Sequence, residues 1–339
     1  MNRKCIRWTW LVLVTLTLGV GSQHSQARPH AVPNFESLGE VASTTMLRAT
    51  PSGQLRGMAY GPFREGQSPE WGIYPTLAEV RQDMPLLKLV ASGIRTYGCQ
   101  HLDTVVTATH EISLPLTLGV WLSGSSAEDA AEIDCAVGQA QVNPHITSIV
   151  AGNESVLSGR LTATQVCSYT LDPRERTGLP ITAGEPWHIW IDHPDLAACV
   201  DYLLIHIHPY WECQPIENAV AFVQEKYQQV STQYPDKPVV IGEIGWPTAG
   251  TGREGHCGPM PTPGREQQSQ FAADFLEWAR QDEVDFYFFE AFDEPWKCEG
   301  GRPEVECHWG IYDSNRVPKP ARHWLVACQI WLPLVFNRH

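Results

Sequence analysis

The stretch Ile149-Val150-Ala151-Gly152-Asn153-Glu154 runs from apolar residues through a glycine to an amide and a carboxylate. A second stretch, Val239-Val240-Ile241-Gly242-Glu243, repeats the pattern and also ends on a glutamate. A buried parallel strand has such an apolar sequence and delivers its last residues to the loop side of a sheet. Packing does not explain why each of the two stretches ends on a glutamate, because an unpaired carboxylate is costly to bury. The two stretches therefore predict parallel strands that carry Glu154 and Glu243 to one cleft.

Short apolar runs of this kind recur along the chain at a spacing of about 33 residues, close to one strand–helix unit of an eightfold barrel. The expected strands are 57–60, 93–97, 116–120, 146–150, 180–183, 202–207, 238–241 and 285–289. Between them, 76–89, 218–227 and 267–280 show the clearest helical patterning. An open doubly wound sheet also alternates strands and helices, but it usually carries a glycine-rich phosphate loop after its first strand. Residues 61–66 do not have that motif. We therefore predict an α/β fold with a single (β/α)8 TIM barrel.

The N-terminus has the pattern of an export signal. Three basic residues precede the apolar stretch 8–20, and Ser25-Gln26-Ala27 is a small-x-small cleavage site. The apolar stretch is short of the about 20 residues that a membrane span needs. We predict a signal peptide at 1–27, a lead-in segment at 28–55, the catalytic barrel at 56–326 and a C-terminal tail at 327–339. The mature protein is expected to be secreted or periplasmic without stable membrane insertion; an uncleaved anchor is the alternative.

Charge and cysteine content narrow the partners and the compartment. Removing residues 1–27 takes away three basic and no acidic residues, so the net charge of −14 becomes −17. This acidity argues against nucleic acid as a partner, and we expect a monomer. Cys5 leaves with the signal peptide, which leaves nine of ten cysteines and hence an odd count. Cys298–Cys307 and Cys213–Cys257 are the expected disulfides, because no cysteine spacing fits a zinc site.

Aromatic and polar side chains gather at the predicted strand ends, where barrel enzymes place their active sites. Aromatic rings stack on the C–H faces of sugars, while carboxylates, amides and imidazoles bind hydroxyls. Two glutamates at such positions are also what a retaining glycosidase needs. We therefore predict a sugar cleft with Glu154 and Glu243 as its catalytic pair. The expected substrate-binding residues are Tyr60, Arg95, Tyr97, Asn153, Glu185, Trp187, His206, Tyr210, Trp211, Trp246, Glu290 and Trp296.

An ordered series of motifs resembles glycoside hydrolase family 17, the β-1,3-glucanase family, in its bacterial and fungal-type branch. The matching segments are GMAYGPF at 57–63, GQSP at 66–69, IRTY at 94–97, GNE at 152–154, EPW at 185–187, VIGEIGWP at 240–247 and EAFDEPWK at 290–297. His206, PYW at 209–211 and Trp309-Gly310 complete the series. The resemblance implies a (β/α)8 barrel that acts on β-1,3-glucan. It places the acid/base, Glu154, on strand four and the nucleophile, Glu243, on strand seven.

These roles imply particular neighbours. Glu243 must be ionised, so we expect hydrogen-bond donors beside it, with Tyr210 and Arg95 as candidates. Glu154 must carry a proton before the attack, and Asn153 would bind the sugar 2-hydroxyl.

The remaining polar residues have less specific expected roles. Glu185 and Glu290 are assigned to substrate hydroxyls and to orienting the catalytic pair, with a rim salt bridge to Arg95 or Lys297 as the alternative. His206 is expected to face the cleft, and His208 to fix the loop that follows.

Several functions share these features. A β-1,3-glucan transglycosylase would use the same two glutamates, and a non-catalytic barrel would only bind glucan. His206-Ile207-His208 also suggests a metal-dependent hydrolase, because residues i and i+2 of a strand share a face. No further ligands stand at telling spacing, so we expect neither a metal nor a cofactor.

Overall fold

The computed structural model describes residues 54–329, apart from the side chains of 327–329. The expected signal peptide, all but the last two residues of the lead-in segment and residues 330–339 of the tail lie outside the described residues.

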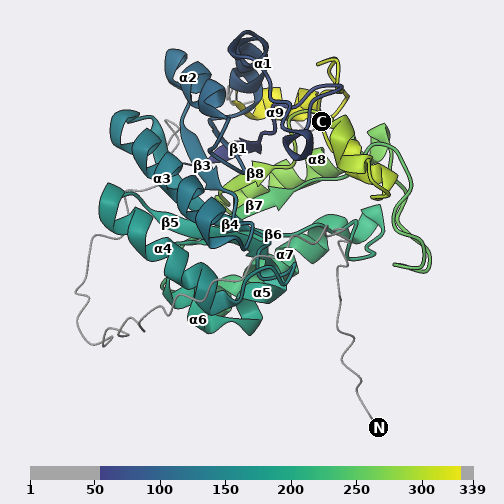
Figure 1. Cartoon of the computed structure of the whole chain (residues 1–339). Helices are drawn as coiled ribbons and strands as arrows, with labels where there is room; N and C mark the ends of the chain where they lie inside the picture. Colours follow the sequence, from purple (N-terminus) through teal and green to yellow (C-terminus); the bar gives the residue numbers. More distant parts are fainter. Residues whose placement is uncertain (1–53, 330–339) are drawn as a thin grey trace, which may run out of the picture. The chain divides into compact units, whose positions relative to one another are not determined.

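Eight parallel strands close into a barrel in which each strand pairs with the next along the chain and β8 pairs with β1 (Figure 1). The strands are β1 Arg56–Ala59, β2 Gly93–Arg95, β3 Leu116–Val120, β4 Ile146–Asn153, β5 Ile181–Pro186, β6 Leu203–His206, β7 Val239–Ile244 and β8 Phe286–Phe288. Each overlaps a strand expected from the sequence. The prediction of a (β/α)8 TIM barrel is thus confirmed.

Helices connect successive strands and surround the barrel (Figure 1). They are α1 Leu77–Val90, α2 Asp103–Glu111, α3 Ser126–Val142, α4 Ala163–Thr177, α5 Trp187–Asp192, α6 Pro194–Ala198, α7 Ile216–Gln233, α8 Arg265–Gln281 and α9 Arg322–Gln329. Short 3-10 helices lie at η1 Pro69–Trp71, η2 Pro295–Cys298 and η3 Glu304–Cys307. The helices expected at 76–89, 218–227 and 267–280 correspond to α1, α7 and α8. Helix α9 continues past residue 326, where we expected the barrel to end.

Local sequence explains several helix boundaries. Thr76 and Glu79 form a reciprocal capping box at the start of α1, and Thr162 and Gln165 form another at α4. Helix α4 ends at Gly178, whose φ of 68° is a left-handed conformation that glycine adopts without a steric penalty. The strands between the helices are buried along almost their whole length. Such burial on both faces is why they have continuous apolar sequences.

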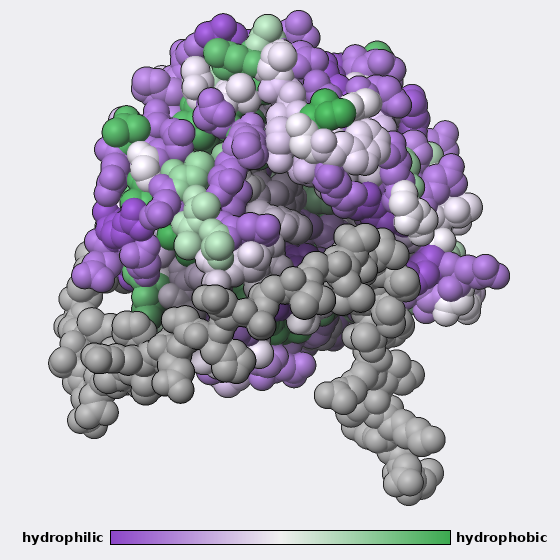
Figure 2. Space-filling model, viewed as in Figure 1, coloured by the Kyte–Doolittle hydropathy of each residue, from purple (hydrophilic) through white to green (hydrophobic). Residues whose placement is uncertain are grey.

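The outer surface contrasts with these buried strands. On the face shown in Figure 2, the described residues are mostly hydrophilic, and the hydrophobic ones form small, separate patches. Scattered hydrophobic residues are normal on a surface that contacts water. Among the described residues, the apolar ones are thus concentrated in the barrel and beneath its helices.

Disulfides fix loops and helices that flank the strands. The two expected pairs, Cys213–Cys257 and Cys298–Cys307, are both present, so these predictions are confirmed. Two further disulfides join Cys99 to Cys135 and Cys167 to Cys199. The ninth cysteine, Cys328, falls among the side chains that are not described. Among the described helices, none is both long and apolar enough to cross a membrane.

Candidate active site

Glu154 and Glu243 meet at the carboxyl ends of β4 and β7. Glu154 directly follows β4, and Glu243 is the penultimate residue of β7, where its backbone pairs with His206 of β6. One carboxylate oxygen from each glutamate and a ring nitrogen of His206 all lie within 4.8 Å of one another. In retaining glycosidases the two carboxyl groups lie about 5–5.5 Å apart, whereas inverting enzymes separate them by about 6.5–9.5 Å to admit a water. The separation found here falls at the retaining end.

Glu243 lies among cationic and hydrogen-bonding groups. Its Oε2 lies 3.1 Å from Nε2 of His208, and its Oε1 lies 3.6 Å from both Arg95 Nη1 and His206 Nε2. Its side chain is only 6% exposed. Burial alone would raise the pKa of Glu243, but the hydrogen bond from His208 and the Arg95 guanidinium together hold that pKa well below its usual 4.5. The carboxylate is therefore ionised, as a nucleophile must be.

The donors expected beside Glu243 were only partly right. Arg95 lies beside the carboxylate, but Tyr210 does not reach it: the Tyr210 hydroxyl is buried and has no hydrogen-bond partner. Instead, the group that contacts Glu243 is His208, which we expected only to fix a loop. Tyr97 also lies near Glu243. Burial, followed by the charge of Glu243, raises the pKa of the Tyr97 hydroxyl.

Arg95 is fully buried and links three elements of the site. Its Nη2 donates to Asn153 Oδ1 at 2.7 Å, while Nη1 donates to the Gly242 carbonyl at 2.9 Å and lies 3.0 Å from His206 Nε2. A guanidinium has no acceptor atom, so His206 Nε2 must accept this hydrogen bond. The hydrogen-bond network therefore assigns the ring proton to Nδ1, which lies 3.1 Å from Glu154 Oε1. His206 thus donates to Glu154 while Arg95 fixes its tautomer.

Glu154 differs from Glu243 in both exposure and backbone. Its side chain is 34% exposed, so it can exchange protons with solvent and with an incoming acceptor. Its φ of 49° lies in the left-handed region, which is uncommon for residues other than glycine. The conformation is held by a hydrogen bond from its N–H to the Gly184 carbonyl at 2.7 Å and by another from the Ser158 N–H to its own carbonyl. Strained backbone of this kind concentrates at functional sites.

The two glutamates predicted to bind sugar hydroxyls, Glu185 and Glu290, are both fully buried. Glu185 is fully buried and accepts hydrogen bonds from the N–H groups of Val156 and Leu157, at 2.7 and 3.2 Å. Burial, partly offset by these bonds, raises the pKa of Glu185 to about 8. Glu185 thus has backbone partners for its carboxylate, and its binding of a sugar hydroxyl stays a prediction. These hydrogen bonds hold the loop that follows Glu154.

Glu290 is likewise fully buried, and it forms the salt bridge that was its alternative interpretation. Its partner is Lys297, which also pairs with Glu294 and lies 4.8 Å over the Phe289 ring. Burial raises the pKa of Glu290, Lys297 lowers it and Glu294 raises it further; the net change is upward. This cluster supports the loop after β8.

The predicted aromatic residues fall into two groups. Tyr60 and Trp246 are fully buried and do not line a cleft: Tyr60 donates to Asp83 of α1, and Trp246 donates to the Thr262 carbonyl. The partly exposed group follows the carboxyl ends of strands, and its members are Tyr97 and Trp211 in loops, Trp187 at the start of α5 and Trp296 in η2. Trp121 at the end of β3 is 41% exposed.

Trp121 is connected to the end of β4 through the Arg160 guanidinium. The Arg160 guanidinium lies 4.6 Å from its ring centroid, and Arg160 also donates to the Asn153 carbonyl. Arg160 thus links the exposed Trp121 ring to the backbone of Asn153.

Sequence reasoning missed Glu306. It lies in η3, where burial raises its pKa to about 7; Lys297 and His208 lower that pKa, and the charges of Glu154 and Glu243 raise it. It is therefore a third carboxyl within electrostatic reach of Glu154 and Glu243. No strand-end pattern marks it, because it follows β8 by 18 residues in a loop closed by Cys298–Cys307.

Two groups of described residues place potential metal ligands close together. Glu154, His206 and Glu243 form one, and Cys213, His256 and Cys257 form the other. In the second group both sulfurs are consumed by a disulfide and cannot act as thiolate ligands. The first group offers two carboxylates and one imidazole, but the His206 nitrogens already face Glu154 and Arg95.

A barrel that brings two glutamates close together at its strand ends, one buried and one partly exposed, has the type of site found in glycosidases. The sequence-family model of the BtgE/BtgC glycoside hydrolase domain matches residues 57–310 of this chain. The chain therefore belongs to the BtgE/BtgC glycoside hydrolase family.

Individual relatives agree with this assignment. The chain is 27% identical over 297 residues to a protein of Aspergillus clavatus named "probable glucan endo-1,3-beta-glucosidase btgC"; the match covers 77% of this chain and 41% of that protein. It is 27% identical over 263 residues to a "glucan 1,3-beta-glucosidase" of Arthroderma benhamiae, covering 71% and 83%. It thus spans about two fifths of the Aspergillus relative. A glycoside hydrolase family 17 β-1,3-glucanosyltransferase from Rhizomucor miehei shares the fold, with a TM-score of 0.67, 24% identity and coverage of 79% of this chain and 96% of the other.

Proposed function

We propose that this protein is an exported glycoside hydrolase that cleaves β-1,3-glucan with retention of anomeric configuration. The observation that carries the proposal is the approach of the Glu154 and Glu243 carboxylates to within 4.8 Å. The names of the relatives from Aspergillus and Arthroderma support β-1,3-glucan as the substrate. The four disulfides support an oxidising compartment outside the cytosol.

The first chemical step forms a covalent intermediate. A Glu243 carboxylate oxygen attacks the anomeric carbon as the bond to the leaving oxygen breaks, and Glu154 gives its proton to that oxygen. Glu243 is suited to the attack because its cationic neighbours keep it ionised despite burial. The product is a glycosyl ester on Glu243.

The second step regenerates the enzyme. Glu154, now a carboxylate, removes a proton from water while the water oxygen bonds to the anomeric carbon and Glu243 departs. His206 donates from Nδ1 to Glu154 Oε1 and thereby orients the carboxyl during both proton transfers. If another sugar hydroxyl takes the place of water, the same residues carry out transglycosylation.

Asn153 is placed to bind the sugar next to the reacting carbon. Because Arg95 donates to Asn153 Oδ1, the Asn153 amide NH2 remains as the donor for a 2-hydroxyl. A hydrogen bond to that hydroxyl strengthens in the transition state. Arg95 therefore orients both Asn153 and the catalytic pair.

The test is to incubate the purified mature protein with linear β-1,3-gluco-oligosaccharides and to resolve the products by mass. Wild type is compared with Glu154→Gln and Glu243→Gln. Shorter products that disappear in both variants support hydrolysis, and the anomer first released reports retention. Products longer than the substrate indicate a transglycosylase. Absence of cleavage by wild type, with binding retained, would show that the barrel only binds glucan.

A further inference from the structure

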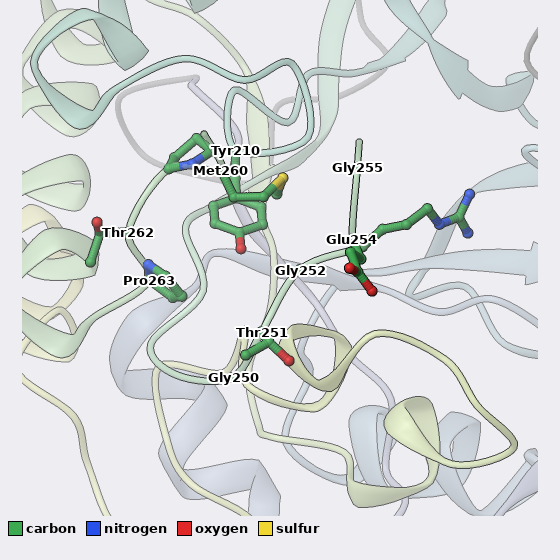
Figure 3. A pocket seen from close by; sticks show the side chains of 11 residues that line it. Tyr210, Gly250, Thr251, Gly252, Glu254, Gly255, Met260, Thr262 and Pro263 are labelled. Carbon is green, nitrogen blue, oxygen red and sulfur yellow. The ribbon is translucent and has the colours of Figure 1, made fainter. Parts of the chain in front are cut away.

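A pocket separate from Glu154 and Glu243 is formed by residues 250–255 and 260–263 of the loop between β7 and α8, together with Tyr210 of the β6–α7 loop (Figure 3). Its volume is about 460 Å³, within the range of small-molecule sites. Three interactions hold the loop in place: the Cys213–Cys257 disulfide, a hydrogen bond from His256 to the Trp211 carbonyl at 2.6 Å and one from the Thr251 N–H to Glu304 at 3.2 Å. The pocket is therefore preformed.

A buried hydroxyl without a partner points into this pocket. Tyr210 is fully buried, and its hydroxyl makes no hydrogen bond. The hydroxyl is directed toward the turn that contains Gly252 (Figure 3), where a Cβ atom would lie only 2.9 Å from it and 2.6 Å from Met260 Cε. Buried polar atoms without partners are rare in native proteins and call for an explanation. The hydroxyl is covered in this conformation, so a ligand in the pocket would supply the missing hydrogen bond once the flexible Met260 side chain moves aside.

The lining favours a neutral ligand that carries both hydroxyls and C–H faces. Met260, Pro261 and Pro263 provide apolar surface, and the Tyr210 hydroxyl is joined by the threonines of the loop. The single Arg253 and the single Glu254 leave no excess of either charge, so an anion or a cation would gain little. A hexopyranose has this combination of surfaces.

Aromatic rings separate the pocket from the nucleophile. The Tyr210 ring contacts Trp309 with centroids 6.0 Å apart, Trp309 contacts His208 at 5.1 Å, and His208 contacts Glu243. A sugar in the pocket would therefore not be the one whose bond is cleaved.

We propose that this pocket is a second glucan-binding site, which holds a sugar residue of the polymer apart from the catalytic cleft. The identity of the sugar rests on the proposed function; the existence of the site rests on the unpartnered Tyr210 hydroxyl in a preformed neutral pocket. The site would increase affinity for chains long enough to reach it.

Two substitutions test the pocket in the Glu154→Gln/Glu243→Gln background, where no substrate is consumed. Gly252→Ala inserts a methyl group into the pocket, and Met260 can yield because its end is flexible. Tyr210→Phe removes one oxygen and keeps the ring. Gly138→Ala in α3 is the matched control, because open space surrounds that position. Affinity for laminarin is measured by retardation in native gels that contain the polysaccharide, and folding is checked by thermal unfolding.

We expect the dissociation constant for laminarin to rise about tenfold in each pocket variant, as for the loss of one good hydrogen bond, and to be unchanged in Gly138→Ala. An unchanged constant in both pocket variants would overturn the proposal; if Gly252→Ala fails to fold, Tyr210→Phe decides alone. Failure of the parent protein to be retarded would also overturn it. Cleavage of oligosaccharides by wild type is scored separately, so loss of the proposed function and loss of this site give different results.

Discussion

Replacing His208 with phenylalanine tests how Glu243 is kept ionised. The substitution keeps a ring between Phe289 and Trp309, which His208 contacts at centroid distances of 5.3 and 5.1 Å, but removes the nitrogen that lies 3.1 Å from Glu243 Oε2. A hydrogen bond to a charged group contributes about 1.5–3 kcal/mol. Because a tenfold change in an acid dissociation constant corresponds to about 1.4 kcal/mol, the loss of this bond should raise the pKa of Glu243 by about 1–2.

The direction of the effect on activity follows from the nucleophilic role that we propose for Glu243. The folded enzyme holds the pKa of Glu243 below its usual 4.5, and only the ionised carboxylate attacks. A higher pKa moves the acidic limb of the profile of log kcat/KM against pH to higher pH. At a pH between the wild-type pKa and the raised pKa, wild type keeps its activity, whereas kcat/KM of the variant should fall about tenfold for each pH step of 1 below the raised pKa. Activity near neutral pH should change far less.

The assay is kcat/KM on a β-1,3-gluco-oligosaccharide from pH 8 down to the lowest pH at which circular dichroism shows both proteins folded, with points below pH 3. His323→Phe, a substitution at an exposed position of α9, serves as the control and should leave the profile unchanged. An acidic limb that coincides in His208→Phe and wild type would refute the argument that His208 lowers the pKa of Glu243. A uniform loss at every pH would show that the ring positions substrate or loop instead.

Further predictions concern the acid, a buried carboxyl and a disulfide. Glu154→Gln should lower kcat/KM on oligosaccharides by about 10²–10⁴-fold, with far less loss on an aryl glucoside whose leaving group needs no proton; equal losses on both substrates would contradict the acid role. Because burial raises the pKa of Glu185 from 4.5 to about 8, its contribution to stability is full below pH 4.5 and is lost as pH rises to about 8. That loss is on the order of 5 kcal/mol, given about 1.4 kcal/mol for each step of 1 in pKa. Glu185→Gln should therefore flatten the free energy of unfolding against pH in that window; an unchanged slope would place the titration elsewhere. Replacing Cys213 and Cys257 with serine should cost about 2–4 kcal/mol in denaturant unfolding, whereas a loss near zero would show that the loop is held by its other contacts.

The sequence was most informative about which residues end buried strands. Apolar runs predicted all eight strands because both faces of each strand are covered, and this removes the ambiguity of alternating patterns. The sequence was less informative about whether the side chain at a strand end points into the core or toward solvent. Tyr60 and Trp246 stand near strand ends as Trp121 does, yet the first two are buried and Trp121 is exposed. Which way a strand-end side chain points depends on the register of the closed barrel, which no single run encodes.

Polar networks were predicted least well, because they depend on partners from several strand–helix units. His206-Ile207-His208 did indicate two side chains on one face, but not that they would contact different glutamates. Nor could the sequence indicate that Glu185 would be satisfied by the backbone after Glu154.

The disulfides group the strand–helix units in twos. Cys99–Cys135 links the second unit to the third, Cys167–Cys199 the fourth to the fifth, and Cys213–Cys257 the sixth to the seventh. Within the described residues, the eighth and first units are joined without a disulfide, by the β1–β8 pairing and by a hydrogen bond from the Leu55 N–H to Asp285. The barrel thus consists of three disulfide-linked pairs of units and a fourth pair, the eighth and first units, that is held in the described part of the chain by non-covalent contacts alone. Amide hydrogen exchange should therefore begin where the eighth unit meets the first, and each disulfide-linked pair should exchange as one cooperative unit.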